Sequence, residues 1–154
     1  MASSTEASDA QMMNAGNSAP TFELMSLKGE TVSLASLKGE KVYVKFWASW
    51  CSVCLAGMEE LNTLAGESNG FKVYTIVSPG VNGEQDKASF IEWFSTLGYD
   101  NVEVLFDETG DVQKEYGIRA YPTSAYIGSD SVLVKVAPGH MSNEAIKTAF
   151  EGIN

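Results

Sequence analysis

Residues 46–54 read Phe-Trp-Ala-Ser-Trp-Cys-Ser-Val-Cys and contain the only two cysteines of the chain, Cys51 and Cys54. The segment before them, residues 41–47, is β-branched and aromatic, with apolar side chains at both odd and even positions. This pattern predicts a central strand that is covered on both faces. The segment after Cys51, residues 52–65, carries leucine and methionine at three-residue steps, which predicts a helix. The cysteine pair is therefore expected where a buried strand leads into a helix.

This position predicts different roles for the two cysteines. Cys51 lies at the helix N-terminus, where unpaired backbone N–H groups and the positive end of the helix dipole favour a thiolate. Cys54 follows one turn later and can reach Cys51 while being less exposed. We expect Cys51 to attack a partner disulfide and Cys54 to attack the resulting mixed disulfide, which releases the partner as a dithiol. The reverse reaction oxidises dithiols, and the sequence leaves the direction open.

Length and charge exclude several classes of function. The chain has 154 residues, enough for one domain, with 10 basic and 20 acidic side chains and a formal charge of -10. That charge disfavours binding to nucleic acid or to anionic lipid surfaces. Two cysteines and one histidine cannot complete a usual four-ligand zinc site in one chain. We expect no metal and no organic cofactor, only a redox-active disulfide.

The pattern along the chain predicts an alternating α/β domain behind a disordered lead. Residues 1–19 are mostly small and polar, without a sustained period and without the basic start and apolar run of a signal peptide. We expect this lead to be a spacer or tether and the folded domain to span residues 20–154. The predicted elements of the domain, besides those around the cysteines, are strands near 22–24, 31–34, 71–77, 102–106, 123–127 and 132–136 and helices near 84–97, 111–116 and 142–150.

Two groups of residues carry a resemblance to a known family. The segment 46–54, together with Tyr121-Pro122-Thr123, resembles the thioredoxin superfamily. The opening residues 19–24 and the pattern over residues 29–39 resemble its exported, membrane-associated branch, which includes thioredoxin-like lipoproteins and cytochrome-maturation reductases. The resemblance covers residues 20–150. It implies a thioredoxin fold with a central mixed sheet flanked by helices, an N-terminal β-hairpin and a helix–strand unit inserted before Tyr121.

Within that branch the chain is similar to the surface thioredoxin-like lipoproteins of streptococci. This similarity implies a thiol–disulfide oxidoreductase that reduces protein disulfides outside the cytoplasm, with an oxidised methionine sulfoxide reductase as client. It also implies a membrane electron-transfer protein that reduces the chain again and a lipid anchor at the cell surface. We expect a monomer. The alternatives are an apocytochrome thiol reductase and a non-catalytic module that binds copper or another thiophilic metal through both cysteines.

The resemblance also assigns residues to substrate docking. It implies that Pro122 follows a cis peptide bond and faces the cysteine pair, and that the backbone of Tyr121 pairs with an extended substrate segment. The X-Pro sequence alone favours an ordinary trans bond. Trp47 and Trp50 are expected to pack around the disulfide and to offer an apolar docking surface, with simple core filling as the alternative for Trp47.

Three positions differ from the family pattern. Many thioredoxins place a buried Asp where Lys45 stands, and exported relatives often carry Glu and Pro where Gly57 and Glu59 stand. We hypothesise that Lys45 favours a cysteine thiolate electrostatically while Glu59 or water moves protons. The alternative is that Lys45 extends to the surface and Glu59 is a solvated helix residue. His140 is far from the cysteines in sequence, and we interpret it as a loop residue rather than a catalytic base.

Overall fold

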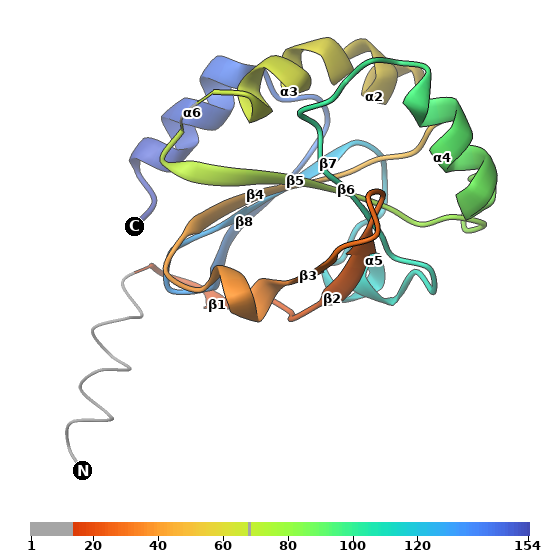
Figure 1. The fold of residues 1–154 in the computed structure, drawn as a ribbon. Helices are drawn as coiled ribbons and strands as arrows, with labels where there is room; N and C mark the ends of the chain where they lie inside the picture. Colours follow the sequence, from red (N-terminus) through yellow and green to blue (C-terminus); the bar gives the residue numbers. More distant parts are fainter. Residues whose placement is uncertain (1–13, 68) are drawn as a thin grey trace.

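A mixed sheet runs through the computed structural model, which describes residues 14–67 and 69–154 (Figure 1). Its eight strands follow the spatial order β1-β8-β7-β4-β5-β6-β2-β3. The pairs β4–β5 and β5–β6 are parallel, and the other neighbours are antiparallel. The strands are β1 (Asn17–Ser18), β2 (Glu23–Ser26), β3 (Thr31–Ser33), β4 (Lys41–Phe46), β5 (Phe71–Val77), β6 (Val104–Phe106), β7 (Thr123–Ile127) and β8 (Val132–Pro138).

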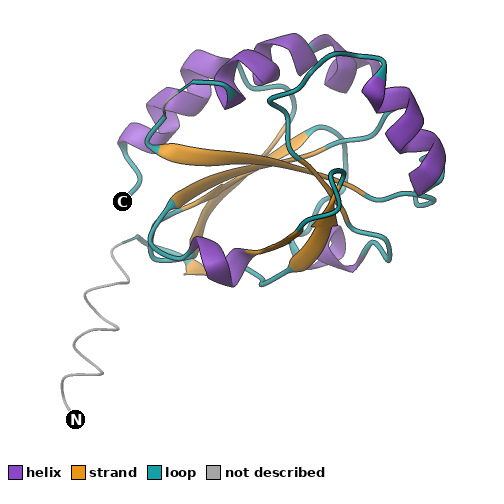
Figure 2. Cartoon of the chain, viewed as in Figure 1, coloured by secondary structure: helices purple, strands orange, loops and turns teal. Residues whose placement is uncertain are grey.

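Helices cover both faces of the sheet (Figure 2). One apolar core lies between the sheet and α2, α3, α4 and α6, and a second lies between the sheet and the shorter helices η1 and α5. None of the helices in the described ranges is long and apolar enough to cross a bilayer. The helices are η1 (Leu34–Leu37), α2 (Ser52–Ala56), α3 (Met58–Ala65), α4 (Lys87–Ser95), α5 (Asp111–Glu115) and α6 (Asn143–Glu151).

Strand β4 is central and covered on both faces, as its sequence predicted. Tyr43 contributes to the core under α2 and α3, whereas Val42 and Val44 contribute to the core on the opposite face. Because side chains alternate along a strand, Lys45 faces the same side as Tyr43. The strand therefore directs one charged side chain toward the helices that follow the cysteines.

Both predicted additions to the sheet are present. Strands β2 and β3 form the N-terminal antiparallel hairpin, and β2 joins the sheet through β6. Helix α4 and strand β6 form the unit inserted before Tyr121, with β6 parallel to β5. The predicted thioredoxin fold is therefore confirmed.

The folded part of the chain begins earlier than residue 20, where we predicted it to begin. Strand β1 pairs with β8, and Ala19 is buried. Asn14 donates hydrogen bonds to Asp130 from its backbone N and from Nδ2, each at 2.9 Å. Hydropathy does not report such pairing, because it is made by polar side chains and backbone groups. The disordered lead that we predicted lies, for residues 1–13, outside the described residues.

Two predicted helices have different limits in the structure. The helix expected over 52–65 is two helices, α2 and α3, with Gly57 between them. The helix expected from residue 84 begins at Lys87, because the Asp86 carboxylate accepts a hydrogen bond from Ser89 N at 2.8 Å and caps α4. Residues 78–86 therefore form a loop beside the cysteines rather than a first helical turn.

Candidate active site

Cys51 and Cys54 lie at the junction of β4 and α2. Cys51 is the N-cap residue of α2, and its Sγ accepts a hydrogen bond from Cys54 N at 3.3 Å. Cys51 is 7% exposed and Cys54 is 0% exposed, and both are free thiols. Both thiols are therefore buried, but Cys51 keeps a small exposed fraction and Cys54 keeps none, so Cys54 is the less exposed of the two, as the spacing predicted.

The buried thiol differs from an ordinary cysteine in its ionisation. Burial raises the pKa of Cys54, and the adjacent Cys51 side chain raises it further. The backbone at Ala48 and the charge of Lys45 act in the opposite direction. Since burial has the larger effect, Cys54 is protonated at neutral pH and must lose its proton before it can attack a mixed disulfide.

The docking residues expected from the resemblance lie beside Cys51. The Tyr121–Pro122 peptide bond is cis, and Cys51 Sγ donates to the Tyr121 carbonyl oxygen at 3.6 Å. Trp50 is 55% exposed, and its ring and the Tyr121 ring form a T-shaped pair with a centroid distance of 5.9 Å. Val53, which is 50% exposed, adds a second apolar side chain. These side chains give the entrance to Cys51 an apolar surface.

Trp47 has a different role from Trp50. Its side chain is 1% exposed and packs against Phe90, Trp93 and Phe94, with ring centroids 5.6 to 6.5 Å apart. It fills the core under α4 and is not available to a partner. The alternative of core filling is therefore correct for Trp47.

The loop over residues 78–86 forms hydrogen bonds to the docking residues Trp50 and Tyr121, and the sequence did not indicate these contacts. Asn82 O accepts a hydrogen bond from Trp50 Nε1 at 3.0 Å, and Asn82 Nδ2 donates to Tyr121 OH at 3.2 Å. Tyr121 OH in turn donates to Gln113 Oε1. Asn82 joins two side chains that are distant in sequence, and no local pattern reports such a contact.

A buried carboxylate in the same loop holds the segment that precedes Cys51. Glu84 is 7% exposed and accepts hydrogen bonds from Ser49 N at 2.7 Å and from Ser49 Oγ. Gln85 N also donates to this carboxylate, at 3.1 Å. The loop and the turn between β4 and α2 are therefore joined by several hydrogen bonds to one ionisable group.

Lys45 lies beneath the cysteines, as hypothesised, and does not extend to the surface. It is 4% exposed. Burial lowers the pKa of its amine, and the charges of Cys54, Glu60 and Cys51 raise it. Glu59, in contrast, is exposed, and the structure does not bring it to the cysteines. Adjacent residues of a helix point in directions about 100° apart, so Glu60 rather than Glu59 faces Lys45.

His140 also lies closer to the site than its position in the sequence indicated. A Cβ atom added to Gly57 would lie 3.0 Å from His140 Nδ1 and 3.4 Å from Lys45 Nζ. His140 Nε2 lies 3.8 Å from Glu60 Oε1. Our interpretation of His140 as a loop residue is correct for its backbone, but its ring reaches α3 behind Cys54.

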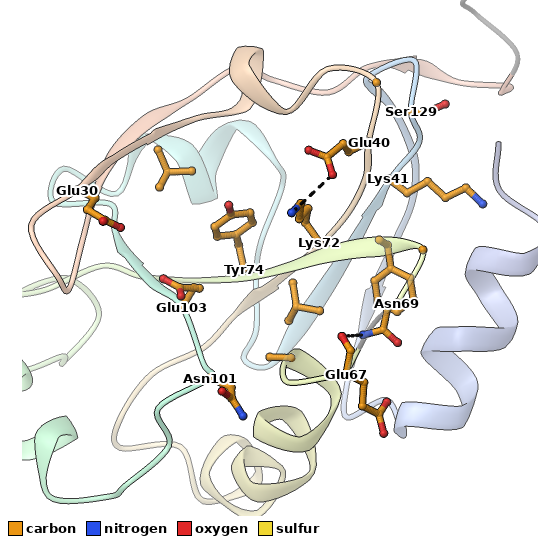
Figure 3. Close-up of a pocket in the computed structure, with 16 residues that line it drawn as sticks. Glu30, Glu40, Lys41, Glu67, Asn69, Lys72, Tyr74, Asn101, Glu103 and Ser129 are labelled. Carbon is orange, nitrogen blue, oxygen red and sulfur yellow. Dashed lines mark hydrogen bonds and ion pairs between the residues drawn. The ribbon is translucent and has the colours of Figure 1, made fainter.

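A cavity of about 780 Å³ lies at the opposite end of β4 and β5 from the cysteines (Figure 3). Charged side chains of both signs line it, and Lys72 pairs with Glu40 there at 3.7 Å. It contains no nucleophilic thiol. In residues 14–67 and 69–154, no group of three or more His, Cys, Asp or Glu side chains is placed to hold a metal ion. The redox chemistry therefore belongs to the cysteine pair and not to this cavity.

Comparison with known proteins agrees with this geometry. The family model described as Redoxin matches residues 14–152. The chain belongs to the Redoxin family. This match includes both cysteines, the cis proline and the segment from residue 14 that precedes the predicted domain start.

Individual Redoxin relatives agree on the fold and the type of reaction. The crystal structure of the exposed lipoprotein thioredoxin of Streptococcus pneumoniae is 44% identical, with a TM-score of 0.84, and the alignment covers 87% of this chain and 100% of that one. An uncharacterized protein of Haemophilus influenzae is 45% identical over 84% of this chain and 83% of its own length. The thiol-disulfide oxidoreductase ResA of Halalkalibacterium halodurans is 28% identical over 93% of this chain and 79% of its own length. Together with the Cys-x-x-Cys pair, these relatives show that the chain is a thioredoxin-like thiol–disulfide oxidoreductase.

Proposed function

We propose that this protein reduces protein disulfides outside the cytoplasm by cycling Cys51 and Cys54 between dithiol and disulfide, with an oxidised methionine sulfoxide reductase as its client. The observation that carries the proposal is the placement of Cys51, which is 7% exposed, beside the exposed Trp50 and the cis Tyr121–Pro122 bond, with the fully buried Cys54 one helical turn further on. The similarity to an exposed lipoprotein thioredoxin supports the location. The resemblance to streptococcal surface lipoproteins supports the client.

The first step uses the less buried sulfur, that of Cys51. The Cys51 thiolate attacks one sulfur of the client disulfide, a bond forms between Cys51 and that sulfur, and the client S–S bond breaks. The second client sulfur leaves as a thiolate and takes a proton from solvent. At the helix N-terminus, the Cys54 N–H donates to Cys51 Sγ and stabilises the attacking thiolate.

The second step uses the buried sulfur. Cys54 loses its proton, attacks Cys51 Sγ and forms the Cys51–Cys54 disulfide, which releases the client as a dithiol. Two electrons have then moved from this protein to the client. A membrane electron-transfer protein with its own dithiol returns them by the same exchange in reverse. The redox-active disulfide serves as the only cofactor in this cycle.

The apolar surface around Cys51 is the docking site for the client in this proposal. An extended client segment runs beside the Tyr121 backbone, and its apolar side chains contact Trp50 and Val53. Tyr121 and Trp50 are both held by Asn82, so this surface is ordered before the client arrives. Preorganisation of this kind reduces the entropic cost of binding.

Trapping of the mixed disulfide tests the proposal. In Cys54→Ser the second step is impossible, so we expect oxidised methionine sulfoxide reductase to accumulate as a covalent complex with Cys51. The complex is measured by non-reducing electrophoresis and identified by mass spectrometry of the joined peptides. Cys51→Ser is the matched control, and we expect it to form no complex.

Two results would contradict the proposal. Reduction of an oxidised apocytochrome peptide by the wild-type protein, without any reduction or trapping of methionine sulfoxide reductase, would assign the alternative client. Stoichiometric binding of Cu(I) by a protein that exchanges no disulfide at all would assign the metal-binding alternative.

A further inference from the structure

Three ionisable side chains from separate elements meet behind Cys54. Lys45 comes from β4, Glu60 from α3, and His140 from the loop between β8 and α6. A Cβ atom added to Gly57 would lie 3.0 Å from His140 Nδ1 and 3.4 Å from Lys45 Nζ. The histidine ring and the lysine amine therefore both lie next to Gly57. The His140 ring also approaches Glu60, and His140 Nε2 lies 3.8 Å from Glu60 Oε1.

The three side chains differ in their exposure to solvent. Lys45 is 4% exposed, whereas the side chains of His140 and Glu60 are 39% and 41% exposed. A buried ammonium is costly unless opposite charges compensate it. The charges that act on the Lys45 amine are those of Cys54 in α2, of Cys51 at its N-cap and of Glu60 in α3, and the His140 ring lies nearby. Across the sheet, Lys45 pairs with Thr75 on β5 and with Ser124 on β7.

The Cys54 thiol, on which Lys45 acts, must change its protonation state in every cycle. Cys54 has to lose a proton before it attacks and regain one when the protein is reduced again. It is 0% exposed, so its proton cannot pass directly to solvent. Of the ionisable groups that act on Cys54, Lys45 is the one that is not a thiol.

We propose that Lys45, Glu60 and His140 form a proton-transfer group for Cys54, in which Lys45 accepts the Cys54 proton and His140, positioned by Glu60, exchanges it with solvent. This inference rests on the dithiol–disulfide cycle proposed above. In this step Lys45 starts as the neutral amine, the form that its burial favours. The Cys54 S–H bond breaks, Lys45 Nζ takes the proton, and the resulting ammonium pairs with the thiolate. The attack on Cys51 then consumes the thiolate. The ammonium, now beside a neutral disulfide, passes its proton through His140 to water.

Gly57 and Glu60 place the histidine ring for this role. A Cβ at 3.0 Å from two ring atoms would be tighter than nine in ten real Cβ contacts, so glycine at position 57 leaves room for the ring. Glu60 Oε1 accepts a hydrogen bond from Asn143 N at 2.9 Å, which fixes the carboxylate against the start of α6. Glu60 therefore also connects α3 to α6, and the test has to separate proton transfer from this structural role.

A small aromatic disulfide separates the two chemical steps without a protein client. Reaction of the reduced protein with dithiobis(nitrobenzoate) releases one coloured thiolate when Cys51 attacks and a second when Cys54 resolves the mixed disulfide. The two releases are followed by stopped-flow absorbance across a range of pH. The variants are Lys45→Met and His140→Ala, and Glu59→Gln is the matched control because it removes an exposed charge one residue before Glu60.

We expect Lys45→Met and His140→Ala to slow the second release about a hundredfold or more at neutral pH, because one positioned acid–base group contributes about 10²–10⁴-fold. Their second-release rates rise with pH toward the wild-type rate as hydroxide takes the Cys54 proton. The first release changes less than the second. Added imidazole restores the second release in His140→Ala but not in Lys45→Met, and Glu59→Gln reacts like the wild type.

A second release with wild-type rate and pH dependence in both variants overturns the proposal. Slowing in His140→Ala that imidazole does not relieve and that leaves the pH profile unchanged also overturns it, because a lost structural contact would do the same. If Lys45→Met does not fold, the imidazole experiment decides alone. The assay contains no protein client, so failure to trap methionine sulfoxide reductase would remove that client and leave this result standing.

Discussion

Cys51 and Cys54 are the same residue type three positions apart, yet their surroundings give them different chemistry. Cys51 caps a helix and keeps 7% exposure, and a backbone N–H stabilises its anion. Cys54 is in the core, and its burial favours the neutral thiol. Cys51 can therefore attack as a thiolate, whereas Cys54 cannot attack until another group accepts its proton.

The raised pKa of Cys54 predicts how the stability of the reduced protein depends on pH. Above the ordinary thiol pKa of 9.0 the unfolded chain ionises while folded Cys54 keeps its proton. The stabilisation is complete below pH 9.0 and is lost as pH rises, by at most about 1.4 kcal/mol per pH unit. Urea unfolding of the reduced protein from neutral pH to about pH 10 measures this loss.

The comparison variant for this measurement is Cys54→Ala, which removes the thiol and keeps the other ionisable groups. We expect its free energy of unfolding to fall less steeply above pH 9.0 than that of the wild type. Equal slopes in the two proteins would show that Cys54 ionises as readily in the fold as in the unfolded chain.

At the scale of elements, the site depends on how a loop is attached to a turn. The turn between β4 and α2 packs against α4 through Trp47, and the loop over residues 78–86 adds hydrogen bonds to the same turn. Glu84 binds Ser49 through two hydrogen bonds, and Asn82 binds both Trp50 and Tyr121. Several hydrogen bonds to one carboxylate fix the turn more firmly than packing alone would.

Removal of the Glu84 carboxylate tests this attachment. In Glu84→Ala, Ser49 N and Gln85 N lose their acceptor, and we expect the free energy of unfolding to fall by about 1–3 kcal/mol. The rate of insulin-disulfide reduction should fall as well, because the turn that carries Cys51 loses its support. Glu92→Ala on the exposed face of α4 is the control. Equal stability and activity in the two variants would mean that the attachment has no effect.

At the scale of the whole molecule, the two ends of the described chain meet at the edge of the sheet. Asn14 donates two hydrogen bonds to Asp130, and its Oδ1 accepts one from Asn154 N at 2.9 Å. Strand β1 extends the sheet beyond β8 on the side opposite the N-terminal hairpin. The residues from Asn14 onward therefore belong to the fold and contribute to its stability.

Asp130→Ala tests the contribution of this edge. The substitution removes the acceptor of Asn14 N and Nδ2 and of Val132 N, and we expect the protein to lose about 1–3 kcal/mol of stability. The cysteines lie elsewhere, so insulin-disulfide reduction at a temperature where the protein is folded should keep the wild-type rate. Thermal unfolding measures the loss, with exposed Asp100→Ala as control. A melting temperature like that of the control would show that β1 adds nothing to the fold.

The sequence by itself determined the order of the elements and the position of the reactive pair. The central strand over residues 41–47 and the helix after Cys51 follow from periodicity, which records burial along one continuous segment. The spacing of Cys51 and Cys54 follows from the pitch of one helical turn. These features are local, so they could be predicted without knowledge of distant residues.

Only the tertiary structure decided which side chains surround the pair. Glu60 rather than Glu59 faces Lys45, and His140 approaches Glu60 of α3 although the two are 80 residues apart in the sequence. Asn82 joins Trp50 to Tyr121, which lie 32 residues before it and 39 residues after it. A periodic pattern shows that a residue is buried or exposed, but it does not show which distant residue it contacts. Those contacts arise when the strands pair and the helices pack, because only then do the separate segments share one site.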